Sequence, residues 1–214
     1  ADSLTGCIAG LEGKLPEIYE APGLMPCIST IAPKGRDLFF ERLTDLKNRL
    51  YAQGKFQLQF SIHTTDEKLR NLLIPVKKWS FAKIAEFGEE FYEKGERKIT
   101  LNFALVKGVP LEPRIILKHF NPDRFLIKIT PVNPTYQTVK NRLFSYLDPS
   151  RNGADYQIVQ ELHSSGYEVI VSIGEVEENY IGSNCGQYVM THLKSKKHIR
   201  DGYTIWGRCA QQSK

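Results

Sequence analysis

Short apolar strands alternate with helices along most of this 214-residue chain, and this alternation is what most limits the folds open to it. Residues 56–63 alternate apolar and polar side chains, as a strand with one buried face does. Residues 80–94 place their apolar side chains at helical spacing. Where strands and helices take turns along a chain, the strands form a mostly parallel sheet that the helices cover. We therefore predict an α/β fold with a mostly parallel sheet.

The other expected elements keep the same order. Helices are expected over residues 4–19, 37–51, 66–73, 112–120 and 155–165, and strands over residues 23–31, 98–106, 124–131 and 167–172. Gly54 and Gly95 follow two of these helices, where a helix end is expected. No apolar run approaches the length of about 18 residues that a membrane span needs, so we expect no contact with a membrane.

Composition sets wide limits on function. The net charge of +5 permits nucleic-acid binding but does not require it. The basic run at residues 194–200 favours a solvated tail, so we expect one domain over residues 1–195 and a basic C-terminal tail over residues 196–214. Four scattered cysteines fit a reducing cytoplasm better than a disulfide scaffold, and no two are close enough for a local metal motif. The first residues, which lack Met, look like a cut inside a longer chain.

Polar residues stand at the ends of several expected strands. Ser29, Ser61, His63 and Asn133 are the ones that matter here. Each has an ordinary structural explanation, since Ser caps a turn, Asn before Pro starts one, and His63 fits a satisfied structural histidine. The carboxyl ends of parallel strands, however, are where ligands bind in such sheets. Taken together, these residues indicate a ligand site at one edge of the sheet.

Cys185 is the strongest single candidate for chemistry. It follows Ser183 and Asn184, which are good helix N-cap residues, and residues 187–194 can form a helix. The positive end of a helix dipole favours the thiolate, which is the nucleophilic form of cysteine. The alternative is that Cys185 is a small buried apolar residue, because cysteine is among the most buried residue types.

Five motifs occur in an order that is typical of one enzyme family. They are Cys27-Ile28-Ser29-Thr30-Ile31, Phe60-Ser61-Ile62-His63, Leu73-Ile74-Pro75-Val76, Ile129-Thr130-Pro131-Val132-Asn133-Pro134 and Asn184-Cys185-Gly186-Gln187. From about residue 25 to about residue 193 the chain resembles the C-terminal two-thirds of the radical S-adenosylmethionine (SAM) enzymes that methylate C2 of adenine in ribosomal and transfer RNA. The related C8-methylating resistance enzymes share this frame. The resemblance implies a partial (β/α) barrel, truncated at its N-terminus.

The resemblance also implies roles for individual residues. Ser29, the segment Ser61-Ile62-His63, and Asn133 would contact SAM. Cys185 would be the catalytic cysteine, methylated on sulfur by one SAM molecule. A 5′-deoxyadenosyl radical made from a second SAM would then remove hydrogen from that methyl group, and the carbon would add to the adenine ring. The RNA partner would be ribosomal or transfer RNA.

The departures from the family are equally specific. The Cys-x3-Cys-x2-Cys loop that holds the 4Fe–4S cluster is absent, so this chain has no metal ligands of its own and we expect them upstream in an intact protein. Without the cluster the chain alone should be inactive. The acidic residues at 175–178 would repel RNA phosphates, which keeps two alternatives open. One is a radical SAM paralogue with a non-RNA substrate, and the other is a non-catalytic module that binds a nucleotide or RNA. A truncated barrel would also expose the strand near Met25, so we expect a homodimer through that edge or cover by the N-terminal segment.

Overall fold

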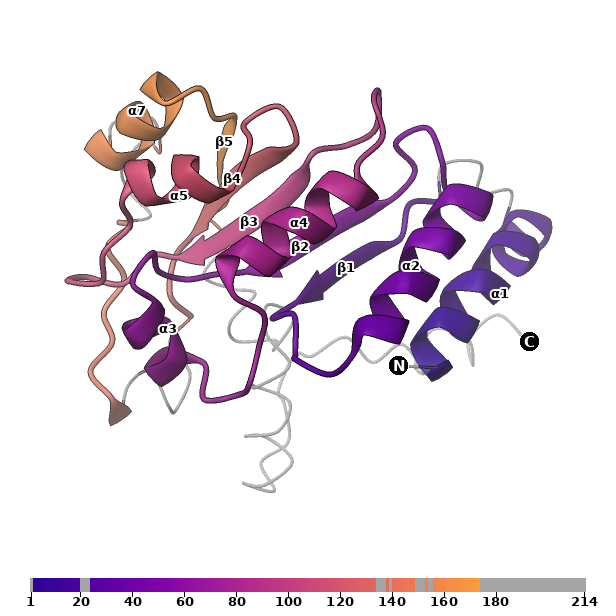
Figure 1. Cartoon of the computed structure of the whole chain (residues 1–214), viewed down its shortest axis with the longest axis horizontal. Helices are drawn as coiled ribbons and strands as arrows, with labels where there is room; N and C mark the ends of the chain where they lie inside the picture. Colours follow the sequence, from indigo (N-terminus) through magenta and orange to yellow (C-terminus); the bar gives the residue numbers. More distant parts are fainter. Residues whose placement is uncertain are drawn as a thin grey trace, which may run out of the picture. The chain divides into compact units, whose positions relative to one another are not determined.

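The computed structural model describes residues 2–19, 24–133, 138, 140–148, 153 and 156–173. Strands and helices alternate in it as predicted. In chain order they are α1 (Asp2–Tyr19), β1 (Cys27–Thr30), α2 (Asp37–Leu50), β2 (Gln57–Ser61), α3 (Glu67–Leu73), α4 (Phe81–Phe91), β3 (Ile99–Ala104), α5 (Pro113–His119), β4 (Phe125–Thr130), α7 (Gln157–Ser164) and β5 (Val169–Val171). The predicted α/β class is therefore confirmed (Figure 1).

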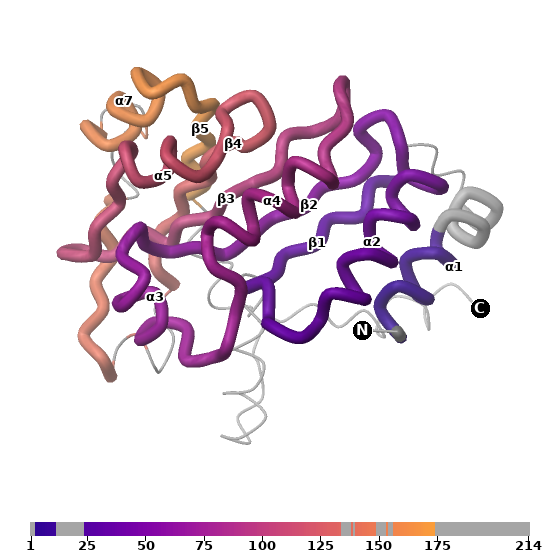
Figure 2. Tube along the Cα trace, in the orientation of Figure 1, coloured from indigo at the N-terminus to yellow at the C-terminus, as the bar shows by residue number. Residues whose placement is uncertain are grey.

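The strands form one five-stranded sheet in the order β1-β2-β3-β4-β5. The pairs β1–β2, β2–β3 and β4–β5 are parallel. Consecutive strands are neighbours, so the chain crosses the sheet in one direction, as the run of colours in Figure 2 shows. Sequential parallel strands joined by helices are the repeating unit of a (β/α) barrel.

One face of the sheet packs against α2 and α4. Phe60 of β2 is fully buried and lies 6.3 Å from the ring of Phe40 on α2 and 6.2 Å from the ring of Phe87 on α4, centroid to centroid. Gly88 of α4 lies against Phe125 of β4, where the missing side chain makes room for the aromatic ring. These contacts place the apolar core between the sheet and these helices (Figure 1).

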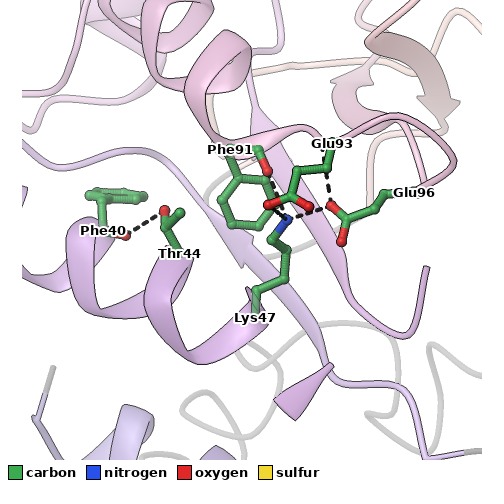
Figure 3. A network of polar contacts seen from close by, with 6 residues as sticks. All are labelled: Phe40, Thr44, Lys47, Phe91, Glu93 and Glu96. Carbon is green, nitrogen blue, oxygen red and sulfur yellow. Dashed lines mark hydrogen bonds and ion pairs between the residues drawn. The ribbon is translucent and has the colours of Figure 1, made fainter. Parts of the chain in front are cut away.

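Helix α4 begins where the sequence predicts and ends earlier. Ser80 is its N-cap, with its hydroxyl accepting a hydrogen bond from the Lys83 N–H at 3.3 Å. The helix stops at Phe91 rather than at residue 94, because Tyr92 is extended and Gly95 takes a positive φ of 92°. This turn brings Glu96 back to Lys47 of α2, whose ammonium also donates to the Phe91 carbonyl at 2.9 Å (Figure 3). The early end of α4 therefore creates a buried ion pair.

Strand β1 is an edge strand among the described residues, since β2 is its neighbour in the sheet. Helix α1 packs beside α2, where the Tyr51 hydroxyl donates to the Ile8 carbonyl at 2.6 Å. A homodimer through β1 stays a prediction. The described residues hold no helix long and apolar enough to cross a membrane. The predicted boundary between residues 195 and 196 lies outside the described residues.

The chain divides into two compact units. The first comprises residues 1–103, 109–129 and 152–171, and the second comprises residues 104–108, 130–151 and 172–214. Within the second unit, the Lys107 N–H donates to the Phe144 carbonyl at 2.9 Å and the Tyr146 N–H donates to the Leu105 carbonyl at 2.8 Å. These bonds flank an antiparallel bridge between Val106 and Ser145.

Candidate functional site

The face of the sheet turned away from α2 and α4 is polar. Side chains alternate between the two faces of a strand. Since Leu58 and Phe60 are buried on the side of the helices, the polar residues between and beside them point to the opposite face. We call this surface the polar face, and it comprises Ser29 of β1, Gln57, Gln59 and Ser61 of β2, and Thr100 and Asn102 of β3. Ser29 is exposed, Thr100 is buried, and the other four are half-buried. A row of hydroxyl and amide groups thus crosses three strands.

Register and hydrogen bonds place these side chains level with one another. Ser29 pairs with Gln59, Gln59 pairs with Thr100, and Ser61 pairs with Asn102. The Gln59 amide donates to the Ser29 hydroxyl at 3.1 Å, and the Gln57 amide donates to the Thr100 hydroxyl at 3.0 Å. Each glutamine is therefore held against a neighbouring strand.

In this row, the side-chain oxygen of Asn102 accepts no hydrogen bond from the described residues. Its Oδ1 is buried and has no hydrogen-bond partner among the described residues. Its strand neighbour on the other side is Lys128 of β4, since the Ile99 N–H donates to the Arg124 carbonyl and this bond sets Ile99 level with Phe125. Buried polar atoms are normally hydrogen-bonded, so Asn102 Oδ1 is placed to accept from a ligand or from water.

The structure brings together two of the residues predicted from the sequence. Ser29 and Ser61 share the polar face on adjacent strands. Ile62 is an apolar residue that follows Ser61 and is only 1% exposed, so it is available to a ligand through its backbone alone. Its N–H is already used, donating to the Asn102 carbonyl at 2.9 Å. His63 lies in the loop directly after β2.

His63 is neutral and held in an unusual backbone conformation. Its φ of 67° is in the left-handed region, which a histidine adopts less readily than glycine or asparagine. Its N–H lies 3.3 Å from the same Asn102 carbonyl that Ile62 contacts. Burial, and secondly the positive charge of Arg70, lower the pKa of His63 to about 4. The imidazole is therefore uncharged at neutral pH.

The loop that carries His63 is fastened to the loop before α5. The Thr64 hydroxyl donates to the Pro110 carbonyl at 2.8 Å, and the Thr65 hydroxyl accepts from the Glu112 N–H at 3.0 Å. Thr64 and Thr65 are both buried. These bonds fix the segment that follows Ser61, which is where a ligand at the carboxyl edge of the sheet would lie.

The two remaining candidates cannot be placed beside the polar face. Asn133 belongs to the second unit, where its carbonyl accepts a hydrogen bond from the Thr138 hydroxyl at 2.8 Å. Cys185 and the acidic residues at 175–178 lie outside the described residues. Their proposed roles rest on the sequence alone.

Gln59 and Asn102 were missed as candidates by the sequence reasoning, although a signal for them was present. Both occupy polar positions in strands whose alternate residues are apolar, which sets them on the same face as Ser61. Ser61 and His63 lie at or just beyond the end of β2, whereas Gln59 and Asn102 each lie two positions before the end of their strand. Arg70, a buried cation on α3, carried no such signal.

The side chains of the polar face are hydroxyls and amides. Hydroxyl and amide groups match the donors and acceptors of a nucleoside and of an amino-acid group. No group of three or more His, Cys, Asp or Glu side chains that could hold a metal ion occurs among the described residues. Cys7 and Cys27 are both exposed. They do not form a site for a 4Fe–4S cluster.

Comparison with known proteins finds similarity to RNA methyltransferases. The chain is 26% identical over 134 residues to the "Probable dual-specificity RNA methyltransferase RlmN" of Salinispora tropica, an alignment that covers 61% of this chain and 34% of the relative. It is 25% identical over 138 residues to the protein of that name from Rhodococcus opacus, covering 61% and 35%. It is 28% identical over 134 residues to the "Ribosomal RNA large subunit methyltransferase N" of Nitrosopumilus maritimus, again covering 61% and 35%.

These matches confirm the resemblance expected from the five motifs. The alignments span about a third of the length of the relatives. No family model matches the chain, and no solved structure matches it either.

Proposed function

We propose that this chain is one part of a radical SAM enzyme of the RNA adenine methyltransferase type, and that the polar face of its sheet holds SAM. The similarity to RNA methyltransferases supports the class of enzyme. The proposal rests mainly on the polar face, where the side chains of Ser29, Ser61 and Asn102 point away from the helices that cover the core.

The polar face suits the nucleoside portion of SAM. Asn102 Oδ1, buried and without a partner among the described residues, can accept a hydrogen bond from an amino group such as N6 of adenine. Ser29 and Ser61 offer hydroxyls that act as donor or acceptor. Asn133 and His63 would complete the SAM contacts, as the sequence resemblance implies.

SAM, when bound, supplies a methyl group and the source of a hydrogen-abstracting radical. The role of Cys185 is to carry the methyl carbon as a nucleophilic thiolate. We place the 4Fe–4S cluster in the rest of the proposed longer protein, because this sequence lacks the Cys-x3-Cys-x2-Cys loop that holds the cluster in the family it resembles. This chain alone should then bind SAM weakly and should not turn over, and its RNA partner would be ribosomal or transfer RNA.

The first test is SAM affinity of the intact protein, measured by calorimetry. Asn102→Ala and Ser61→Ala should each weaken SAM binding by about tenfold, which is the value of one or two hydrogen bonds. Asn48→Ala is the matched control, since Asn48 is exposed on α2. Unchanged affinity in both polar-face variants would remove the proposed ligand from this surface.

The second test is mass spectrometry of adenine in RNA treated with the reconstituted enzyme. We expect methylated adenine with the native protein and none with Cys185→Ala. SAM cleavage without RNA methylation would favour a paralogue with another substrate, which the acidic residues at 175–178 would suit. Binding of SAM or RNA without any SAM cleavage would favour a non-catalytic module.

A further inference from the structure

Arg70 is a buried cation, and one edge of its guanidinium has no partner among the described residues. It belongs to α3, and the residue is only 3% exposed. Nη1 donates to the Trp79 carbonyl at 2.8 Å, and Cζ lies 5.1 Å from the centroid of the Phe81 ring. Nε and Nη2 have no hydrogen-bond partner within the part of the chain that the structure describes. The guanidinium is therefore held in one orientation by two contacts while two of its nitrogens stay unused.

The two unused nitrogens form one side of the guanidinium. The N–H bonds of Nε and Nη2 run parallel, which is the fork that binds two oxygens of a carboxylate or phosphate at once. Nη1, the nitrogen outside this fork, is the one that the protein itself satisfies. Within the described part of the chain, the arrangement leaves the anion-binding edge of Arg70 without a hydrogen-bond partner.

The surroundings of Arg70 carry an excess of positive charge. The nearby Lys78 ammonium is bound by neutral oxygens, namely Asn71 Oδ1 at 2.8 Å and the Ile74 carbonyl at 2.8 Å. Glu67, one turn earlier on α3, is the carboxylate that acts on Arg70 and favours its charged form. Burial nevertheless lowers the pKa of Arg70 to about 10. Burial, and secondly the Arg70 charge, also lower the pKa values of Lys78 and His63.

A guanidinium this deeply buried, with no carboxylate bonded to it among the described residues, is costly, and a bound anion would offset the cost. The position is also suitable for a ligand, because α3 follows the carboxyl end of β2, where the strand ends at Ser61 and the next loop carries His63. Neutral His63 would add a donor or acceptor without adding a charge.

We propose that the Nε–Nη2 edge of Arg70 binds an oxyanion, a carboxylate or a phosphate, through two parallel hydrogen bonds. Two sources have this chemistry. One is the carboxylate of a bound nucleoside amino acid such as SAM, and this source depends on the proposed function. The other is a phosphate of a polynucleotide, which does not depend on SAM.

The first experiment uses the native chain and inorganic phosphate, with acetate as the carboxylate probe. The Arg70 Nε–H resonance is followed by ¹⁵N–¹H NMR. We expect saturable movement of that resonance and an upward shift of the His63 pKa, because a nearby anion favours the imidazolium. The matched control resonance is that of Arg114, an exposed arginine on α5, which should not saturate.

The second experiment separates the two sources with Arg70→Lys, which keeps the charge and loses the fork, and with Arg114→Lys as control. If the source is the carboxylate, Arg70→Lys should weaken SAM binding by about tenfold or more and leave binding of decarboxylated SAM unchanged. If the source is phosphate, the same variant should weaken binding of a short oligoribonucleotide instead.

Two results overturn the proposal. One is an Arg70 resonance that neither phosphate nor acetate moves, which would mean that water alone fills the edge. The other is a folded Arg70→Lys protein with native affinity for SAM and for the oligoribonucleotide. If Arg70→Lys does not fold, the titration of the native chain decides. If the native protein binds no SAM but phosphate moves the Arg70 resonance, the oxyanion site stands and the proposed function fails.

Discussion

Replacing Lys47 by Met should destabilise the fold far more than a surface substitution on the same helix. The Lys47 side chain is 2% exposed, and its ammonium donates to the Phe91 carbonyl at 2.9 Å and to the Glu96 carboxylate (Figure 3). The Glu96 side chain is 9% exposed, so its charge depends on this partner. Methionine keeps most of the volume of lysine and removes the charge, which leaves Glu96 without its cation.

The size of the effect follows from how deeply each partner is buried. Breaking a buried ion pair by removing one side costs about 3–5 kcal/mol. Glu93, 3.9 Å from the ammonium and 60% exposed, is solvated and adds little. Since Glu96 keeps some access to water at a turn, we expect the lower end, about 3 kcal/mol. For a chain of this size that is a fall in Tm of about 6–12 °C.

The assay is urea unfolding followed by far-ultraviolet circular dichroism. Adding Glu96→Gln to Lys47→Met should restore at least about 1 kcal/mol, because the amide no longer carries an unpaired charge. Arg49→Met is the matched control: Arg49 and Asp45 form an ion pair on α2 with side chains 66% and 62% exposed, and its loss should cost below about 1 kcal/mol. The buried ion pair does not stabilise this part of the fold if Lys47→Met lowers the free energy of unfolding no more than Arg49→Met does. The same conclusion follows if adding Glu96→Gln restores none of the lost free energy.

Three further substitutions test other parts of the fold. Gly88→Ala would set a Cβ 2.2 Å from Cζ of buried Phe125 and should cost about 1–3 kcal/mol, so an unchanged Tm would contradict the packing of α4 on β4. His63, with a pKa lowered from 6.5 to about 4, stays neutral in the fold while the unfolded chain takes up a proton. Stability should therefore fall by up to about 3 kcal/mol as the pH drops from 6.5 to 4, and His63→Asn should flatten that slope in urea unfolding at a series of pH values. Asp66→Ala removes the N-cap of α3 and should cost about 1 kcal/mol in the same assay, with Asp66→Asn close to native.

Most of the fold was predictable because its signals are local. The strict alternation over residues 56–63 gave strand β2, and Ser80 marked the start of α4 as its observed N-cap. The early end of α4 was not predictable in the same way. It depends on Glu96 meeting Lys47, two residues 49 positions apart that no short window connects.

The candidate site was predictable in part. Ser29 and Ser61 share a face because strand alternation and register put them there, which the sequence pattern already implied. The unpartnered edge of Arg70 in the described structure could not be predicted, since it depends on Nη1 bonding the Trp79 carbonyl while the guanidinium lies over the Phe81 ring. Hydrogen-bond satisfaction of a single buried group is a tertiary property, and residue type alone does not reveal it.

The register of β2 determines both which side chains enter the apolar core and which form the polar face. Phe60 is fully buried between α2 and α4, and its neighbours Gln59 and Ser61 face the other way for that reason alone. A slip of β2 by one residue would bury both polar side chains and expose Phe60, at a cost that the packing of the two helices makes prohibitive. The geometry of the polar face is therefore held by residues that no ligand would touch. Truncating Phe60 should consequently weaken ligand binding through the position of Ser61, although Phe60 lies on the opposite side of the sheet.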